Sequence, residues 1–428
     1  MFFFFKKVKV VYSLCCFHGE LTGRSICGNI KLYVCVSQSC TSYCMHIAIV
    51  MLVFLVSHVS SLVCKDIFAR GVKIPRLMHH VRRCVSTNIE QPSGKKRVVF
   101  LGTPQFAAES LQTIVDGSVS NVISPFEVVA VVTQPPGDVK KLSPVHKLGQ
   151  ALKLPILSPE TAKDVEFLTR LESLDIDLCI TAAYGNFLPK RFLSIPKLGT
   201  VNIHPSMLPL YRGAAPVQRS LQNGDSSTGV SVAFTVHKMD AGPIITQIPY
   251  PLTGQEKAPE VLAECFRLGT IALLDALPSI FDRTVQTTNQ DDEKATHAPK
   301  LTVDDAVLDF DTMSAATVHN RCRGFQDWPG VVATFQIGAN AVKMKLITTY
   351  VIEAAASAER SREVTIVKHS QSSGKKALDM LRVVCGDGSI LGILEVLPVS
   401  RKQMPIKDFM NGIKGDKTIH WVPDTPAP

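Results

Sequence analysis

Residues 97–115, RVVFLGTPQFAAESLQTIV, hold an apolar strand, a tight turn and an amphipathic helix in direct succession. Three more apolar strands follow at intervals wide enough for helices, EVVAVVTQ (127–134), DLCITAA (177–183) and TVNIH (200–204). Near-continuous apolar strands separated by helices are typical of a parallel sheet that is covered on both faces. The sequence therefore predicts an α/β domain with a doubly wound, mainly parallel sheet, whose ligands bind at the carboxyl ends of the strands.

The turn after the first strand excludes the common nucleotide-binding folds. Pro104 and Gln105 stand where a GxGxxG turn needs glycine for close approach to a pyrophosphate. The chain also lacks a GxxxxGK[ST] phosphate loop. We therefore expect neither an NAD or FAD enzyme nor a nucleotide-driven P-loop protein.

A polar stretch divides the chain into two folded parts. Residues 286–302, QTTNQDDEKATHAPKLT, contain almost no apolar pair, which is typical of a linker. Beyond it, short alternating segments such as VVATFQI, AVKMKLI and ILGILEV predict a small barrel or sandwich. The expected organisation is a largely unstructured leader at 1–96, a sheet domain at 97–283, a linker at 284–302 and a C-terminal domain at 303–428.

The net charge of +9 is carried by the first 96 residues. They hold thirteen Lys or Arg and three Asp or Glu, whereas the remainder holds 33 basic and 34 acidic residues. Whole-chain charge therefore gives no argument for a nucleic-acid partner, which only a local patch could bind. Eight of the twelve cysteines lie before residue 85, and no CxxC pair indicates a zinc site. The four others are expected to be buried thiols in a reducing compartment: Cys179, Cys265, Cys322 and Cys385.

Residues 67–89 have the composition of an organelle transit peptide. They contain five Lys or Arg together with Ser86 and Thr87, and no acidic residue. Met78 is a candidate for the working start, which would give the short leader MHHVRRCVSTN. The apolar run at 47–55 falls short of the ~20 residues of a membrane-spanning helix, so a membrane anchor is the minority alternative.

The densest chemical signal is VNIHPSMLPLYRGAAP (201–216), followed by HKMDAGP (237–243). Asn202 and His204 are two apart on a strand, so both side chains face one side at its carboxyl end. Asp240 follows another strand, and its carboxylate could orient His204 and favour the charged imidazole. These groups offer hydrogen-bond donors to a developing oxyanion, and a base, with no Ser or Cys nucleophile arranged among them. They suit direct attack by a substrate amine on a carbonyl carbon.

Each of these residues alone would also fit a structural role, but their occurrence together favours a catalytic role. The succession of motifs closely resembles the methionyl-tRNA formyltransferase family, particularly its organellar members, over about residues 97–422. The matching motifs include FLGTP (100–104), AAYGNFLP (182–189), YRGAAPVQRSL (211–221) and FQDWPG (325–330). The resemblance implies a formyltransferase-type catalytic domain followed by a small OB-like β-barrel that binds tRNA.

The resemblance also implies roles for individual residues. It implies that Asn202, His204 and Asp240 form the catalytic triad. Around them it implies a folate pocket, lined by Ser206, Met207, Leu208, Pro209, Tyr184 and Gly185. The co-substrate would be 10-formyltetrahydrofolate, without a metal, and the acceptor the α-amine of initiator methionyl-tRNA. Residues implied in tRNA binding are Lys140, Lys141 and Arg212.

Initiator formylation belongs to bacteria-like translation, so the resemblance and the leader together predict an organelle. We expect a mitochondrial monomer that acts in organellar translation initiation, with the plastid as the less favoured location. One departure weakens the expected tRNA contact, because the loop PGDVKKLSPVHK (136–147) lacks the arginines of the family's longer basic loop. Residues 331–428, with thirteen basic and nine acidic residues, remain the expected site of phosphate contacts.

Two alternatives stay open beside this prediction. One is a formyltransferase that acts on a small amine, such as glycinamide ribonucleotide or an amino sugar. The other is a non-catalytic folate- or RNA-binding homologue, which the shortened loop would permit and the intact Asn202, His204 and Asp240 argue against.

Overall fold

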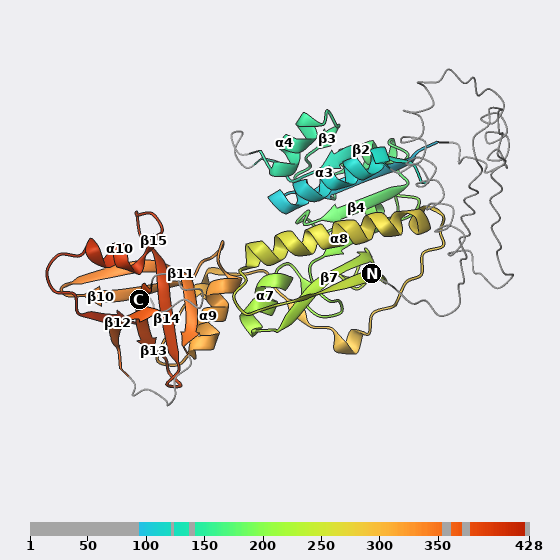
Figure 1. Ribbon diagram of the computed structural model, residues 1–428. Coiled ribbons are helices and arrows are strands. Elements are labelled where there is room, and N and C mark those ends of the chain that lie inside the picture. Colours follow the sequence, from blue (N-terminus) through green and yellow to red (C-terminus); the bar gives the residue numbers. More distant parts are fainter. Residues whose placement is uncertain (1–93, 121–123, 137–141, 353–360, 370–376, 424–428) are drawn as a thin grey trace, which may run out of the picture. The chain divides into compact units, whose positions relative to one another are not determined.

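The computed structural model describes residues 94–120, 124–136, 142–352, 361–369 and 377–423, all within the unit formed by residues 91–428 (Figure 1). Most of the predicted leader, including Met78 and the transit-like segment, lies outside the described residues. Lys140 and Lys141 also lie outside them. Within the described part of the chain, no helix is both long and apolar enough to cross a bilayer.

The first part of the chain folds around a sheet whose strand order is β3-β2-β1-β4-β5-β7-β8. Its strands are β1 (Lys96–Gly102), β2 (Phe126–Val132), β3 (Ile156–Leu157), β4 (Leu178–Ala182), β5 (Thr200–His204), β7 (Ser227–Phe234) and β8 (Ile244–Pro251). The strands from β3 to β5 pair in parallel, whereas β7 and β8 are antiparallel to their neighbours. The prediction of a doubly wound, mainly parallel sheet is confirmed.

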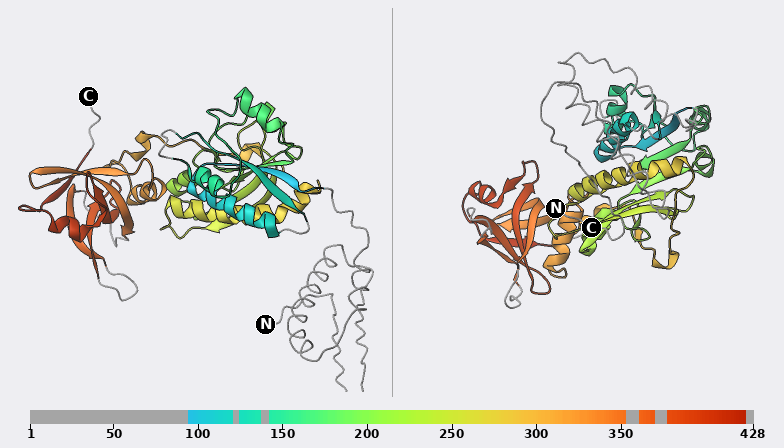
Figure 2. Two further views of the ribbon diagram at one scale, coloured as in Figure 1. Left: turned by 90° about the horizontal axis from the view of Figure 1, so that it is seen from above. Right: turned by 45° about the vertical axis from the view of Figure 1, so that its right-hand side comes forward.

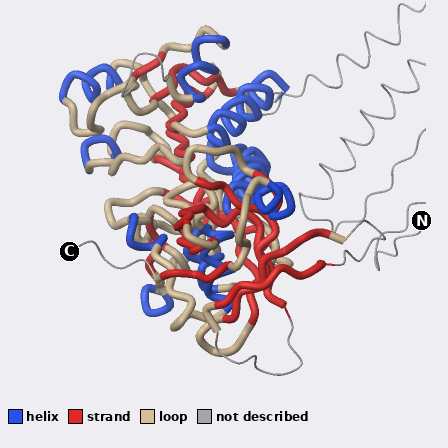
Figure 3. The backbone as a smooth tube through the Cα atoms, turned by 90° about the vertical axis from the view of Figure 1, so that its left-hand side faces the viewer, coloured by secondary structure: helices blue, strands red, loops and turns tan. Residues whose placement is uncertain are grey.

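Helices cover both faces of this sheet (Figure 3). Successive side chains of β1 point to opposite faces, so alternate residues enter two separate cores. Val98 and Phe100 pack into the core shared with α3 and α8, which run side by side (Figure 2). Val99 and Leu101 point into the opposite core, with α5 and α6. The helices of this part are α3 (Gln105–Ser120), α4 (Pro144–Ala151), α5 (Val165–Glu172), α6 (Lys190–Leu193), α7 (Pro216–Asn223) and α8 (Ala258–Phe281).

The antiparallel strand β7 changes how Asp240 reaches the site. Phe234, the last residue of β7, pairs with Val201 near the start of β5, whereas Ser231 pairs with His204 at its end. The chain therefore leaves β7 beside the start of β5, at the opposite end of that strand from His204. Residues 235–243 double back and bring Asp240 within 3.8 Å of His204.

The second part of the chain is a closed antiparallel barrel, which confirms the predicted OB-like domain (Figure 1). Its strands follow the order β11-β10-β16-β12-β13-β14, and a pairing of β11 with β14 closes the ring. Large buried side chains such as Phe335 and Trp421 fill its core. Its elements are α9 (Ala315–Gly324), β10 (Val332–Ile337), β11 (Asn340–Ile352), β12 (Glu363–His369), β13 (Leu378–Val384), β14 (Ile390–Pro398), β15 (Met404–Pro405), α10 (Ile406–Asn411) and β16 (Ile419–Val422).

The segment predicted as a linker is hydrogen-bonded to the catalytic loops along much of its length. A short strand β9 (His297–Ala298) pairs in parallel with β6 (Arg212–Gly213). Thr288 exchanges two backbone hydrogen bonds with Ile244 at the start of β8, each 2.8 Å long. Between them lies the 3-10 turn η2 (Asp292–Lys294), and η3 (Val303–Ala306) precedes the barrel. The segment is therefore fixed to the catalytic domain although its composition is that of a spacer.

The four cysteines of the described chain are free and buried, as the sequence predicts. Burial raises the pKa of the Cys265, Cys322 and Cys385 thiols to about 12. Burial likewise raises the pKa of Cys179. Neutral, buried thiols of this kind act as small apolar side chains in the core.

Candidate active site

Asn202 presents its amide nitrogen at the carboxyl end of β5. The hydroxyl of Thr181, on the neighbouring strand β4, donates a 2.7 Å hydrogen bond to Asn202 Oδ1. Because the carboxamide oxygen is held by Thr181, the NH2 group is left to donate to a ligand. Thr181 is itself buried, whereas Asn202 is half-buried and can still reach a ligand. Thr181 is therefore a positioning residue that the sequence analysis did not identify.

His204 is buried, with only 5% of its side chain exposed. Its Nε2 lies 3.0 Å from the carbonyl oxygen of Tyr211, an acceptor, so Nε2 carries the hydrogen and donates it. The other ring nitrogen, Nδ1, lies 3.8 Å from Asp240 Oδ2. That distance is within ion-pair range but too long for a hydrogen bond. The structure thus brings the two residues together as predicted, without a direct hydrogen bond between them.

Asp240 is fixed by the backbone of the loop that follows β5. Its Oδ2 accepts a 2.8 Å hydrogen bond from the N–H of Gly213. Asp240 has a φ of 48°, in the left-handed region that side chains rarely adopt. Two residues on, a Cβ added to Gly242 would lie 1.8 Å from the carbonyl oxygen of Phe234. The loop can therefore turn here only with glycine at position 242.

The loop from Ser206 to Pro209 is shaped by side chains beneath it. The Ser206 hydroxyl donates to the carbonyl oxygen of Leu210 at 2.7 Å, so it is committed to the backbone. Ser231 on β7, fully buried, donates to the carbonyl of Ser206 and accepts from the N–H of Leu208. Gln247 on β8 completes the network with bonds to Ser231 and to the Leu208 carbonyl.

The members of this loop differ in what they expose. Ser206 and Leu208 are buried, whereas Met207 is half-buried over Gly229. Pro209 follows a cis peptide bond, and its carbonyl accepts from the N–H of Thr296 in the linker. The loop is therefore held in place beside His204, and its assignment to a folate pocket stays a prediction.

Tyr184 and Gly185 lie where three parallel strands end together. The carbonyl of Tyr184 accepts from the Thr103 hydroxyl after β1 and from the Gln134 amide after β2. Gly185 has a φ of 90°, and a Cβ there would lie 2.6 Å from Gln134 Nε2. Phe187, half-exposed, stacks edge-on against His237 of the Asp240 loop, with ring centroids 5.2 Å apart. These loops therefore meet the Asp240 loop at one edge of the site.

Arg212 does not present its guanidinium to solvent. Its side chain is only 3% exposed. Nη1 donates to Asp292 at 2.8 Å, and Nε and Nη2 both donate to Gln290 Oε1. Its assignment to tRNA binding stays a prediction, but in this structure the guanidinium is buried against the linker.

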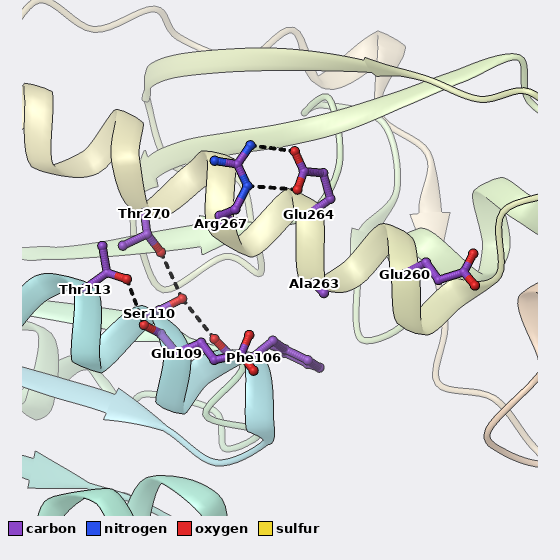
Figure 4. Close-up of a pocket in the computed structure, with 9 residues that line it drawn as sticks. All are labelled: Phe106, Glu109, Ser110, Thr113, Glu260, Ala263, Glu264, Arg267 and Thr270. Carbon is purple, nitrogen blue, oxygen red and sulfur yellow. Dashed lines mark hydrogen bonds and ion pairs between the residues drawn. The ribbon is translucent and has the colours of Figure 1, made fainter.

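A surface pocket between two helices lies away from this site. A hollow of about 220 Å³ between α3 and α8 is lined by Phe106, Glu109, Ser110, Thr113, Glu260, Ala263, Glu264, Arg267 and Thr270 (Figure 4). Glu264 and Arg267 satisfy each other in a two-point ion pair, and Thr270 donates to Ser110 (Figure 4). None of the predicted site residues contributes to it. Among the described residues, no group of three His, Cys, Asp or Glu side chains is placed to hold a metal ion.

Only some of the residues that sequence analysis missed carry a recognisable signal in the sequence. Thr181 and Ser231 are polar positions on otherwise apolar strands, the same signal that drew attention to Asn202. Gln247 gives the same signal on the largely apolar strand β8, whereas Gln290 lies in a polar linker where glutamine is unremarkable. Only the three-dimensional structure brings these two amides onto the catalytic loops.

The site combines an oriented amide donor, a buried imidazole and a carboxylate at the carboxyl end of the interior strand β5. Comparison with known proteins assigns this arrangement to a class. Residues 96–277 match the family model described as "Formyl transferase", and residues 300–414 match "Formyl transferase, C-terminal domain". The chain belongs to the formyl transferase family, and it is an enzyme of formyl transfer. Formyl transferases of this family use formyl-tetrahydrofolate.

Several relatives of known name are similar to this chain over most of their length. The chain is 32% identical over 323 residues to the methionyl-tRNA formyltransferase of Staphylococcus epidermidis, covering 74% of this chain and 96% of the relative. It is 36% identical over 329 residues to the methionyl-tRNA formyltransferase of Lactobacillus johnsonii, covering 75% and 97%. Among solved structures, WlaRD, a sugar 3N-formyl transferase, matches the fold with a TM-score of 0.50 at 16% identity, covering 72% of this chain and all of that one.

Proposed function

We propose that this chain transfers the formyl group of 10-formyltetrahydrofolate to the α-amine of initiator methionyl-tRNA. The observation that carries the proposal is the joint placement of Asn202, His204 and Asp240 in a chain with both family domains. The relatives named methionyl-tRNA formyltransferase, aligned over nearly their whole length, support the choice of acceptor.

Asn202, His204 and Asp240 would each contribute to a different step of formyl transfer. As the amine attacks the formyl carbon, negative charge develops on the formyl oxygen, and the Asn202 amide N–H donates to it. His204 adds a second donor to the same oxygen through Nδ1–H, because Nε2 donates to the Tyr211 carbonyl, and the Asp240 carboxylate lies 3.8 Å from Nδ1. The attacking amine passes its proton to the Asp240 carboxylate, and collapse of the oxyanion expels the folate nitrogen, which takes up that proton. Because the amine is the nucleophile, the reaction needs no covalent enzyme intermediate.

The barrel supplies the proposed surface for tRNA. Exposed basic side chains on and beside α10 are Arg401, Lys402, Lys407 and Lys414. Phosphate contacts of this kind bind without sequence preference and weaken as salt concentration rises. Replacing Lys402 and Lys407 by alanine should therefore raise the KM for tRNA and flatten its dependence on salt.

We also propose that the enzyme acts in an organelle, with the mitochondrion favoured over the plastid. The acid-free, basic composition of residues 67–89 supports this location. Sequencing the N-terminus of the mature protein tests it directly. A mature start well before residue 70 would contradict the proposal.

Formylation assays with the full-length protein test the proposed reaction. The wild type should formylate methionyl-tRNA but not glycinamide ribonucleotide or an amino sugar nucleotide. His204→Ala should lower turnover at least about a hundredfold, the usual loss when an oxyanion donor is removed, while circular dichroism and Tm stay near those of the wild type. His297→Ala, an exposed histidine in the same chain, is the matched control and should stay active. Transfer to free amines but not to methionyl-tRNA would reject the proposal.

A further inference from the structure

The linker reaches the catalytic aspartate through a single side chain. Gln290 is half-buried in a run of exposed residues on both sides. Its Nε2 donates to the carbonyl oxygens of Asp240 at 2.8 Å and Gly242 at 2.7 Å. The two donors of one amide thus bracket the backbone that carries the Asp240 carboxylate. A third contact in this loop, Gly213 N–H to Asp240 Oδ2, holds the carboxylate itself.

The acceptor side of the same amide is also used. Gln290 Oε1 accepts from both Nε and Nη2 of Arg212, at 3.0 and 2.8 Å. Arg212 immediately precedes Gly213, whose N–H binds Asp240. Gln290 therefore touches the aspartate loop with its donors and the neighbouring catalytic loop with its acceptor. Its planar amide sets the spacing between the two loops.

Ion pairs of Asp292 also hold the linker to the catalytic loops. Asp292 pairs with Arg212 at 2.8 Å and with Lys238 at 2.5 Å, two residues before Asp240. The ion pair with Lys238 is exposed on both sides, so it contributes little by itself. The pair with Arg212 has a buried partner, since the guanidinium is 3% exposed. Asp292 therefore acts mainly by holding Arg212 where Gln290 can accept from it.

We propose that Gln290 is a positioning residue for formyl transfer: its amide fixes the distance between Asp240 and His204, so that the linker sets the geometry of the active site. The inference rests on the proposed function, because it assigns Gln290 a part in that reaction. Its physical basis is the 3.8 Å separation between His204 Nδ1 and Asp240 Oδ2, which no direct hydrogen bond fixes. The separation depends on the contacts that hold the aspartate loop, and two of these come from Gln290.

The linker also connects the catalytic domain to the barrel. Strand β9, which begins seven residues beyond Gln290, pairs with β6, and the barrel elements begin after η3. A change in the linker at Gln290 is transmitted to the Asp240 backbone through two hydrogen bonds rather than through a chain of packed side chains. The linker that carries Gln290 thus leads directly into the barrel, which we propose binds tRNA.

Substitutions at Gln290 in the full-length enzyme separate positioning from stability. Gln290→Glu keeps the acceptor for Arg212 and the size of the side chain but removes both donors. Gln290→Met removes donors and acceptor together. Gln286, an exposed linker glutamine that donates only to Thr284, gives the matched control Gln286→Met. Formyl transfer from 10-formyltetrahydrofolate to methionyl-tRNA is measured for each, with Tm by thermal denaturation.

Gln290→Glu should lower kcat by roughly tenfold to a hundredfold, the range expected when a catalytic group moves by up to about 1 Å. The KM for folate should stay within about twofold, and the Tm should fall only moderately, because two hydrogen bonds are lost while the Arg212 contact gains charge. Gln290→Met should lose kcat similarly and lose more stability. Gln286→Met should resemble the wild type in every measurement.

A double-mutant cycle distinguishes positioning from a general structural role. If Gln290 acts through Asp240, Gln290→Glu should have little further effect on the residual rate of Asp240→Asn. Full kcat in Gln290→Glu, or the same loss in both backgrounds, would overturn the inference. Failure of the wild type to formylate methionyl-tRNA would instead reject the proposed function, so the two failures are distinguishable.

Discussion

Thr181 offers the sharpest test of how the site orients its oxyanion donor. In the wild type, the Thr181 hydroxyl lies 2.7 Å from Asn202 Oδ1. Thr181→Val keeps the shape of the side chain but puts a methyl group where the hydroxyl was. A carbon and an oxygen in van der Waals contact are separated by about 3.5 Å. Asn202 must therefore retreat by roughly 0.5–1 Å, and it also loses the bond that fixes its amide.

The two consequences have different magnitudes. Removing one intramolecular hydrogen bond costs about 1 kcal/mol of stability, since Asn202 is half-buried and water can replace the lost donor. Complete removal of an oxyanion donor lowers kcat by about 10²–10³-fold. Because the amide remains present but displaced, kcat for Thr181→Val should fall by about tenfold, with the KM for folate little changed.

Two matched variants make the result decisive. Thr181→Ser restores the hydroxyl and should recover most of the wild-type kcat. Thr270→Val, on α8, removes hydrogen bonds from another buried threonine, which bonds to Ser110 on α3 and to its own helix and not to Asn202, so it should lose similar stability and keep full activity. Steady-state formyl-transfer kinetics and thermal denaturation are the measurements. A Thr181→Val enzyme with wild-type kcat and lowered Tm would refute the orienting role.

Two further variants test the backbone and the electrostatics. Gly242→Ala would put a Cβ 1.8 Å from the Phe234 carbonyl oxygen, so thermal denaturation should show a loss of about 2–3 kcal/mol together with impaired transfer; unchanged Tm would contradict this account. Burial raises the pKa of Glu256, but hydrogen bonds from Thr253 and Gly254 outweigh it and lower the pKa to about 2. The stability from this carboxylate is complete above its unfolded-state pKa of about 4.3 and is lost as pH falls towards 2. The free energy of unfolding of Glu256→Gln should thus fall less steeply than that of the wild type over this range, and equal slopes in urea titrations would contradict the assignment.

The elements that repeat a simple pattern could be predicted from sequence. The apolar strands β1, β2, β4 and β5 alternate with helices, and the barrel strands alternate apolar and polar residues, so both domains follow from periodicity. The position of Asp240 could not be predicted in the same way. Strand β7 runs antiparallel to β5, so the carboxyl-end rule does not apply to it. The return of residues 235–243 depends on Gly242 and on the left-handed conformation of Asp240.

Arg212 shows where residue type is insufficient. An arginine in a catalytic loop of a tRNA-modifying enzyme invites assignment to phosphate binding, and its charge fits that role. The structure instead buries the guanidinium against Gln290 and Asp292, both of which lie about 80 residues further along the chain. No local sequence signal connects residues at that separation, so their pairing emerges only when the linker is folded onto the loop.

The linker was ambiguous for a related physical reason. A polar stretch such as 286–302 has the same composition whether its side chains are solvated or bonded to another loop. The information that decides between the two lies in the partner, at Gly213. A Cβ there would lie 2.5 Å from the carbonyl oxygen of Ala298, so glycine is needed for β6 and β9 to pair. The glycine within the RGAAP motif thus permits the close backbone contact that brings Gln290 to the Asp240 loop, and the signal for a structured linker resides in the catalytic loop rather than in the linker itself.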